Sequence, residues 1–175
     1  CGVIPAHFST VLEQLEAAGQ LENTVICISG DHYPYGMNPE TWNEFYGGEM
    51  DTDFEVYRST LILWSGDMQE PITIDKPCSS LDILPTLSNL FGVEYDSRLL
   101  VGRDVFSDAE PLVMFRNRSW ITADARYNSQ TGKAEFFSGA ESDTYVKSIN
   151  AEVGNRFAVS TRILDNDYWR ILFAE

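Results

Sequence analysis

The stretch that decides the fold is Thr24-Val25-Ile26-Cys27-Ile28-Ser29-Gly30-Asp31-His32. Its first six residues are uncharged and mostly apolar or β-branched, a pattern typical of a short strand buried on both faces. Gly30 ends this run, and a carboxylate and an imidazole follow side by side. Because ligands gather beyond the carboxyl ends of strands in open α/β sheets, we expect the functional groups of this chain here.

Helical and strand patterns lie on both sides of this segment. Apolar residues at helical spacing predict a helix over residues 5–18, and Gly19 follows as a stop signal. A second buried strand is predicted at residues 59–64, and a helix at 81–91 that Gly92 closes. Residues 31–58, between the strands, are predicted to be a long polar loop without regular structure.

The later part of the chain has a different pattern. Short strands are predicted at residues 111–115, 119–123 and 133–137, the last two in a meander. Apolar residues every four positions predict a helix over about residues 142–164, and an apolar closing segment follows. The fold class is therefore α/β, with a small antiparallel strand region and a C-terminal helix.

The composition excludes some classes of protein. The 175 residues are 43% hydrophobic, enough for one domain with a core, and carry a net charge of −15. This charge argues against nucleic-acid binding and against electrostatic docking to anionic lipid. The three cysteines match neither a disulfide framework nor a zinc pattern, and Cys27 is expected to be a small buried residue. The sequence shows no signal peptide and no apolar stretch of membrane-spanning length.

Asp31 and His32 are the candidate metal ligands. A carboxylate oxygen and a neutral imidazole nitrogen together suit a divalent ion such as Mn²⁺ or Zn²⁺. Adjacent residues can share one ion only in an irregular backbone, which Gly30 permits. Two ligands are too few, so others must come from elsewhere. The alternative is that Asp31 caps a turn and His32 packs in a loop.

This motif resembles the central motif of the lipoteichoic acid synthase family, in the alkaline phosphatase and sulfatase superfamily. Further blocks resemble that family in the same order and spacing, and the resemblance covers about residues 10–137. The blocks are Leu21-Glu22-Asn23-Thr24-Val25-Ile26 with Gly30-Asp31-His32-Tyr33; Leu81-Asp82-Ile83-Leu84-Pro85-Thr86-Leu87 with Phe91-Gly92-Val93; Val101-Gly102-Arg103-Asp104-Val105-Phe106-Ser107; and Met114-Phe115-Arg116-Asn117 with Trp120-Ile121-Thr122.

The resemblance implies a site and a reaction. Family members hold one divalent ion, usually manganese, with a Glu, a nucleophilic Thr and an Asp-His pair, and Asp31 and His32 match the pair. The Glu, the Thr and the substrate-binding Arg, Trp and His lie upstream in the family, before this chain. The activity that the resemblance implies for the intact protein is phosphoglycerol transfer from phosphatidylglycerol. We expect the fragment alone to be inactive, with an empty or weakly occupied metal site.

The resemblance also implies an architecture and a location. We expect residues 1–110 to be the C-terminal portion of a sulfatase-like domain with a mixed sheet flanked by helices. Residues 111–140 are then a small antiparallel subdomain, and 141–175 a helical tail. The expected partners are the upstream part of the same catalytic domain and an anionic glycerophospholipid. The expected location is the extracellular membrane face, with an anchor of upstream transmembrane helices.

Other residues have competing interpretations. Tyr33 and Tyr35 could line a wall near the lipid or glycerol group, although ordinary loop packing is favoured. Arg116 and Arg118 could bind phosphate, although structural ion pairs are favoured. His7 is expected to be an ordinary helix-surface imidazole. The remaining acidic candidates are interpreted structurally, as a helix-start residue at Asp82 and a solvated face at Asp51, Asp53 and Glu55.

Two alternative functions remain open at the level of sequence. One is a sulfatase or a phosphoethanolamine transferase of the same superfamily. The other is a non-catalytic lobe in which the Asp-His pair is vestigial.

Overall fold

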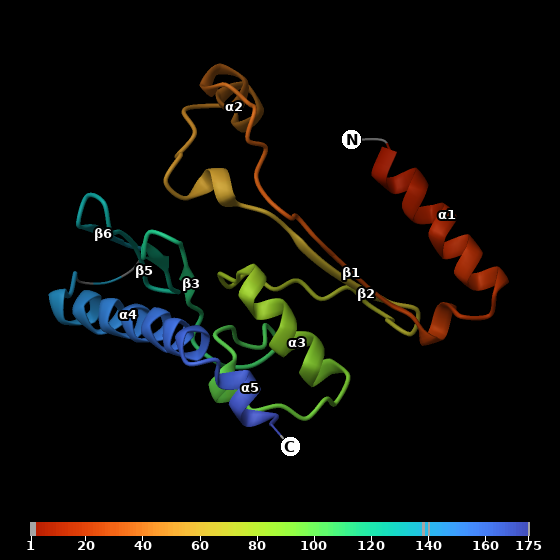
Figure 1. Ribbon diagram of the computed structural model, residues 1–175. Coiled ribbons are helices and arrows are strands. Elements are labelled where there is room, and N and C mark those ends of the chain that lie inside the picture. Colours follow the sequence, from red (N-terminus) through yellow and green to blue (C-terminus); the bar gives the residue numbers. More distant parts are fainter. Residues whose placement is uncertain (1–2, 138, 140, 175) are drawn as a thin grey trace. The chain divides into compact units, whose positions relative to one another are not determined.

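A computed structural model describes residues 3–137, 139 and 141–174. The chain divides into two compact units, Cys1–Thr73 and Ile74–Glu175. Each unit combines helices with an antiparallel sheet, which confirms the α/β fold class (Figure 1). The functional boundaries expected at residues 110 and 140 remain predictions.

The first unit begins with helix α1, Val3–Ala17 (red in Figure 1). Phe8, Leu12 and Leu15 lie on its half-buried face, and Phe8 meets the ring of Trp64 edge-on with centroids 6.3 Å apart. Gly19, with φ of +66°, follows the helix in the left-handed conformation that favours glycine. The predicted helix and its stop are confirmed.

The two predicted strands pair in one sheet, as expected. Strand β1, Val25–Ser29, runs antiparallel to β2, Leu61–Ser65, with Cys27 opposite Leu63. The expectation of burial on both faces is wrong for this unit, because Cys27, Ile28 and Ser29 are exposed and Ile62 is 49% exposed. Cys27 is therefore not the small buried residue that the sequence predicted. The sheet has two strands among the described residues, so each strand is paired along one edge only.

Residues 31–58 are not a structureless loop, and this prediction is wrong. They contain helix α2, Pro39–Tyr46, and a short 3₁₀ turn, Glu55–Tyr57. The Asn38 side chain accepts a hydrogen bond from the Thr41 amide at 2.8 Å and caps α2, and Gly47 closes it with φ of +77°. Asn38 and Pro39 at the start and Gly47 at the end favour a helix here, although the segment is rich in polar residues.

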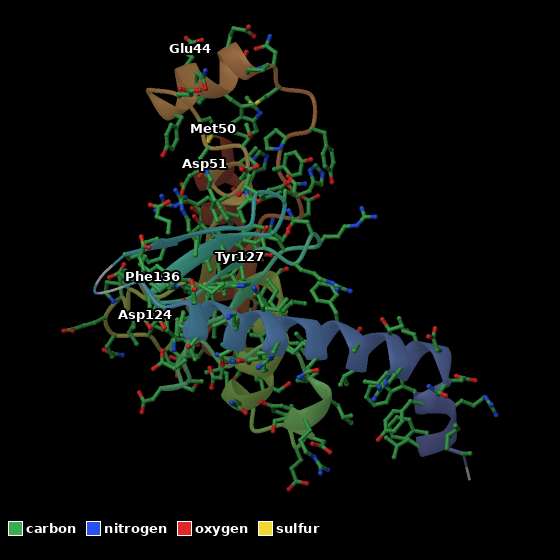
Figure 2. All side chains as sticks on the ribbon, turned by 90° about the vertical axis from the view of Figure 1, so that its left-hand side faces the viewer. Glu44, Met50, Asp51, Asp124, Tyr127 and Phe136 are labelled. Atoms are coloured by element: carbon green, nitrogen blue, oxygen red, sulfur yellow. The ribbon has the colours of Figure 1, made fainter. Side chains whose placement is uncertain are left out.

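The segment after α2 is held by side chains that bind backbone amides. Asn43 accepts from the Met50 amide at 2.8 Å, and Asp51 accepts from the amides of Asp53 and Phe54 at 2.9 and 3.2 Å. Figure 2 labels Met50 and Asp51 in this turn. The Asp51 carboxylate thus has a structural role, because it holds the turn that ends at Phe54. The Phe54 side chain is 8% exposed.

The second unit begins with helix α3, Ile83–Leu90, preceded by a 3₁₀ turn, Ser80–Asp82. Pro85 lies in the first turn of α3, as predicted, and Gly92 follows the helix with φ of +63°. Asp82 is 6% exposed, and its carboxylate accepts from the amides of Ser79 and Arg103, both at 2.7 Å. Its interpretation as a helix-start residue is confirmed.

The predicted antiparallel region is a four-stranded meander. Strands β3, Val113–Met114; β4, Trp120–Ile121; β5, Ala125–Asn128; and β6, Lys133–Phe136, follow one another in space as in sequence. Strand β5 was not predicted, because a tight turn of Thr122 onto Ala125 brings the chain back after three residues.

Helix α4, Asp143–Asp165, confirms the predicted C-terminal helix, and a short helix α5, Tyr168–Leu172, follows it. The Ser142 hydroxyl caps α4 by accepting from the Tyr145 amide at 3.2 Å. The sheet packs on this helix, with Tyr127 and Phe136 against its core (Figure 2). The buried members of this core are Leu112, Trp120, Ala125 and Val153. The helical tail and the antiparallel strands therefore share one core.

Candidate functional site

Asp31 and His32 follow directly on the last residue of β1, so the strand delivers them together to one end of the sheet. A Cβ on Gly30 would lie 2.4 Å from the Ser59 hydroxyl oxygen, which rotation of that side chain can relieve, and 3.5 Å from Ser59 Cβ. The φ of Gly30 does not lie in the left-handed region. The backbone at this position is therefore not one that requires glycine.

The two side chains face each other. The Asp31 Oδ2 atom lies 3.3 Å from His32 Nε2, and Asp31 Oδ1 accepts from the His32 amide at 2.9 Å. Both side chains are open to solvent, with exposed fractions of 86% for Asp31 and 47% for His32. The pair is therefore accessible and held by local contacts.

The hydrogen bonds of His32 decide which ring nitrogen is available. Its Nδ1 atom lies 2.8 Å from the Tyr33 carbonyl oxygen, and a carbonyl can only accept, so Nδ1 carries the hydrogen. The other ring nitrogen, Nε2, lies 3.3 Å from Asp31 Oδ2 and is the one that carries a lone pair for a metal ion when the ring is neutral. A donor bond from one ring nitrogen to a carbonyl is also the usual support of a metal-binding histidine.

The spacing of the pair fits joint coordination. Two ligand atoms about 2.1 Å from one ion, at an angle of about 100°, lie about 3.2 Å from each other. The separation between Asp31 Oδ2 and His32 Nε2 is 3.3 Å. Among the residues that the structure describes, no cluster of three or more acidic, histidine or cysteine side chains is suited to hold a metal ion. The chain thus supplies two suitable ligands, and their binding of an ion remains a prediction.

Aromatic rings surround the pair on one side. The Tyr35 ring stacks on the His32 imidazole with centroids 4.3 Å apart, and Tyr33 meets Tyr35 edge-on at 4.9 Å. Tyr57 packs edge-on against Tyr33 at 5.1 Å, a partner that no sequence signal indicated. Tyr35 is nonetheless 69% exposed, so both the packing role and the substrate-wall role remain open.

The favoured interpretation of Arg116 and Arg118 is wrong. Both side chains are exposed, and neither forms an ion pair with any residue that the structure describes. They lie at the tip of the β3–β4 hairpin. His7 lies exposed on α1, as expected.

The second unit contains a hollow of about 360 Å³, and its lining groups are largely bonded to one another. Arg103 pairs with Glu152 at 2.8 Å, and the Tyr145 hydroxyl donates to Thr122 Oγ1 at 2.8 Å. These contacts engage four of the polar side chains that line it, and the carboxylates of Glu110 and Asp124 are the others. Among the described residues, they belong to no group suited to hold a metal ion. It therefore ranks below the Asp31–His32 pair as a functional site.

Cys78 offers a test of local electrostatics in the second unit. Its side chain reaches the surface, but desolvation by its protein neighbours and the nearby Asp82 carboxylate raise its pKa, which Lys76 only partly offsets. A raised pKa lowers the thiolate fraction, so alkylation by iodoacetamide should increase at higher pH in the folded chain than in the same peptide in urea. Mass spectrometry of the Cys78 peptide measures both profiles. Identical profiles would contradict the assignment.

Comparison with known proteins identifies the family. A family model described as Sulfatase matches residues 6–93, which is half of the chain and includes Asp31 and His32. The chain belongs to the sulfatase family. The superfamily expected from the sequence motifs is thereby confirmed.

The relatives of this chain include lipoteichoic acid synthases and a lipoteichoic acid synthase-like protein. The lipoteichoic acid synthase-like protein YvgJ of Bacillus subtilis is 33% identical over 132 residues, which cover 71% of this chain. The lipoteichoic acid synthase of Staphylococcus saprophyticus is 31% identical over 120 residues, 66% of this chain. The aligned parts cover 21% and 18% of these two relatives, so the chain spans about a fifth of their length. The predicted resemblance to lipoteichoic acid synthases is confirmed.

Solved structures of the same superfamily share the fold of this sulfatase-family chain. The lipoteichoic acid synthase LtaP from Listeria monocytogenes superposes with a TM-score of 0.69 at 21% identity, over 89% of this chain and 42% of that one. An alkaline phosphatase superfamily protein from Vibrio parahaemolyticus gives 0.59 at 17% identity, over 91% and 40%. The predicted architecture therefore agrees with that of the superfamily.

Proposed function

We propose that this chain is the C-terminal part of a metal-dependent phosphoglycerol transferase of the lipoteichoic acid synthase type. The observation that carries the proposal is the Asp31–His32 pair, whose facing ligand atoms lie 3.3 Å apart at the end of a strand in a sulfatase-family chain. The donor phospholipid is phosphatidylglycerol, and the product is a glycerophosphate polymer. The similarity to lipoteichoic acid synthases supports this substrate class.

In this proposal Asp31 and His32 hold a divalent cation, manganese by preference, and transfer no proton themselves. The Tyr33 carbonyl fixes the ring so that Nε2 faces the ion, and the stacked Tyr35 ring limits rotation of the imidazole. When bound, the ion lowers the pKa of a coordinated hydroxyl and stabilises negative charge on phosphoryl oxygens. A threonine nucleophile and the further ligands come from a part of the protein outside this chain.

The partner of the first unit is the upstream part of the same catalytic domain. The partly uncovered β1–β2 sheet supports this assignment, because Ile28 and Ile62 expose 37% and 49% of their surface there. Within the described part of the chain, no helix has the length and apolarity needed to cross a bilayer. We assign membrane anchoring to helices upstream and the working position to the extracellular face. The net charge of −15 argues against a nucleic-acid partner.

A second candidate is hydrolysis of sulfate esters, which the description of the matching family model favours. The substrate that the intact protein uses distinguishes these two candidate functions. The intact protein should transfer phosphoglycerol from a fluorescent phosphatidylglycerol analogue and should leave 4-nitrocatechol sulfate unchanged. Sulfate release at a rate comparable with lipid turnover would favour the sulfatase instead.

The isolated 175-residue chain should show no phosphoglycerol transfer, with or without added manganese. It contributes two of the ligands, and a catalytic metal site needs at least three protein ligands. For the isolated chain, calorimetry should find weak manganese binding and the fluorescent lipid assay should find no product. The intact protein should bind manganese and form product in the same measurements. Tight stoichiometric manganese binding or turnover by residues 1–175 alone would place the active site elsewhere.

A further inference from the structure

Arg116 and Arg118 are two arginines, one residue apart in this acidic chain, that form no ion pair with the described residues. Six other arginines pair with carboxylates, at N···O separations of 3.4 Å or less, and Arg162 likewise forms no ion pair with the described residues. The paired residues are Arg58, Arg98, Arg103, Arg126, Arg156 and Arg170. The chain has 27 acidic residues, yet these two neighbouring arginines have no carboxylate partner among the described residues. They therefore form a locally positive site that attracts anions.

The backbone at this point is strained. The Arg118 amide donates to the Phe115 carbonyl at 2.8 Å, and the Phe115 amide donates to the Ser119 carbonyl at 2.9 Å. These bonds define a hairpin loop whose third residue takes a left-handed conformation, a position that favours glycine. Arg118 occupies it with φ of +68°. A strained non-glycine residue is a reason to look for a function of its side chain.

The loop is also rigid, which prepares the arginines for binding. Asn117 Oδ1 accepts from the Ser119 amide at 2.9 Å, and Ser119 Oγ accepts from the Ser129 amide at 3.0 Å. The Arg118 guanidinium carbon lies 5.7 Å from the centre of the Phe157 ring on α4. This cation–π contact holds the guanidinium, and Arg118 as a residue remains exposed.

We propose that Arg116 and Arg118 bind the phosphodiester groups of a soluble glycerophosphate chain. The proposal rests on the proposed function, which supplies the polymer. A guanidinium presents a planar fork of donors that matches two phosphate oxygens, so each arginine can hold one phosphodiester. A membrane surface fits less well, because each cation adds only about 1 kcal/mol there and the chain is strongly acidic overall.

The test is binding of a dye-labelled tetramer of glycerol phosphate to the intact protein, measured by fluorescence anisotropy at constant salt. Arg118→Gly and Arg116→Gln should each weaken binding about 5- to 10-fold, which is the loss of one charge-assisted contact. Because glycine suits the left-handed position, Arg118→Gly should keep or raise the melting temperature. Lys133→Gln is the matched control: it removes one exposed charge from the same sheet and should change affinity less than 2-fold.

The outcomes separate this proposal from its alternatives. Unchanged affinity in both arginine variants overturns it, as does an equal loss in Lys133→Gln. Loss of binding to phosphatidylglycerol vesicles with retained tetramer binding also overturns it, and assigns the arginines to a lipid surface. His32→Ala should abolish turnover and keep tetramer binding. Arginine-dependent tetramer binding in a protein without transferase activity would uphold this site and reject the proposed function.

Discussion

Phosphoglycerol transfer by the intact protein is expected to fall about 100-fold or more when Asp31 is replaced by Asn or His32 by Ala. Each change removes one of the two facing ligand atoms at the end of β1. Loss even of a residue that only supports a ligand costs about 10- to 100-fold in metal affinity or activity, so loss of a ligand should cost at least as much. The fluorescent phosphatidylglycerol assay measures the effect across a manganese titration.

The matched control for this prediction is Glu44→Gln. Glu44 is an exposed carboxylate on α2, in the segment between β1 and β2, and Figure 2 shows it at the surface of that helix. Its replacement also removes one negative charge, and activity should stay within about 2-fold, because isolated surface charges contribute little. Turnover near the wild-type level in both Asp31→Asn and His32→Ala would show that the pair holds no catalytic metal.

Gly102→Ala is expected to destabilise the second unit by about 3 kcal/mol or more, the largest stability effect predicted for this chain. A Cβ on Gly102 would lie 1.9 Å from the Leu81 carbonyl oxygen and 2.8 Å from the Asp82 amide nitrogen. These are backbone atoms, so no side-chain rotation can relieve the overlap. The Asp82 carboxylate also binds the Arg103 amide at 2.7 Å, which holds the two segments together.

Urea denaturation of the chain, followed by tryptophan fluorescence, measures this effect. Gly154→Ala is the control, because a Cβ there meets no atom within 4 Å and Gly154 lies inside α4. In a helix interior, alanine is more favourable than glycine by about 0.5–1 kcal/mol, so this variant should be slightly more stable. If Gly102→Ala matched the wild type, the close packing of residues 81 and 102 would be wrong.

Regular elements with strong local signals were predictable from the sequence. Helices α1, α3 and α4 have apolar residues at helical spacing and a glycine or cap at their ends, and the structure places them where expected. Helix α2 was missed because its residues are mainly polar, although Asn38 and Pro39 form a recognisable start. Strand β5 was missed because its partner β4 is only three residues away and Arg126 interrupts the apolar pattern.

Burial was harder to predict than secondary structure. The run from Val25 to Ser29 is typical of a fully buried strand, yet its last three residues are exposed in a two-stranded sheet. The residues of a strand show only which environment suits that strand. Whether the strand is buried depends on other segments that pack over it, and the strand's own sequence does not show these. The same reasoning failed for Arg116 and Arg118, because net charge does not show whether a carboxylate lies within reach.

The candidate site was predictable in part. Asp31 and His32 stood out because a carboxylate and an imidazole follow a strand directly. The contacts that orient the ring were not predictable, because they depend on the path of the backbone after Gly30, which turns the Tyr33 carbonyl toward Nδ1. Tyr57 packs against Tyr33 from 24 residues further along the chain, so the contact joins the segment that follows β1 to the segment that precedes β2.

The most direct test of the metal assignment is pulsed electron paramagnetic resonance of manganese bound to the intact protein. His32 should give a nitrogen coupling to the ion through Nε2, and that coupling should be absent in His32→Gln prepared with the same manganese content. An unchanged nitrogen coupling in His32→Gln would contradict the account, because another nitrogen ligand would then hold the ion.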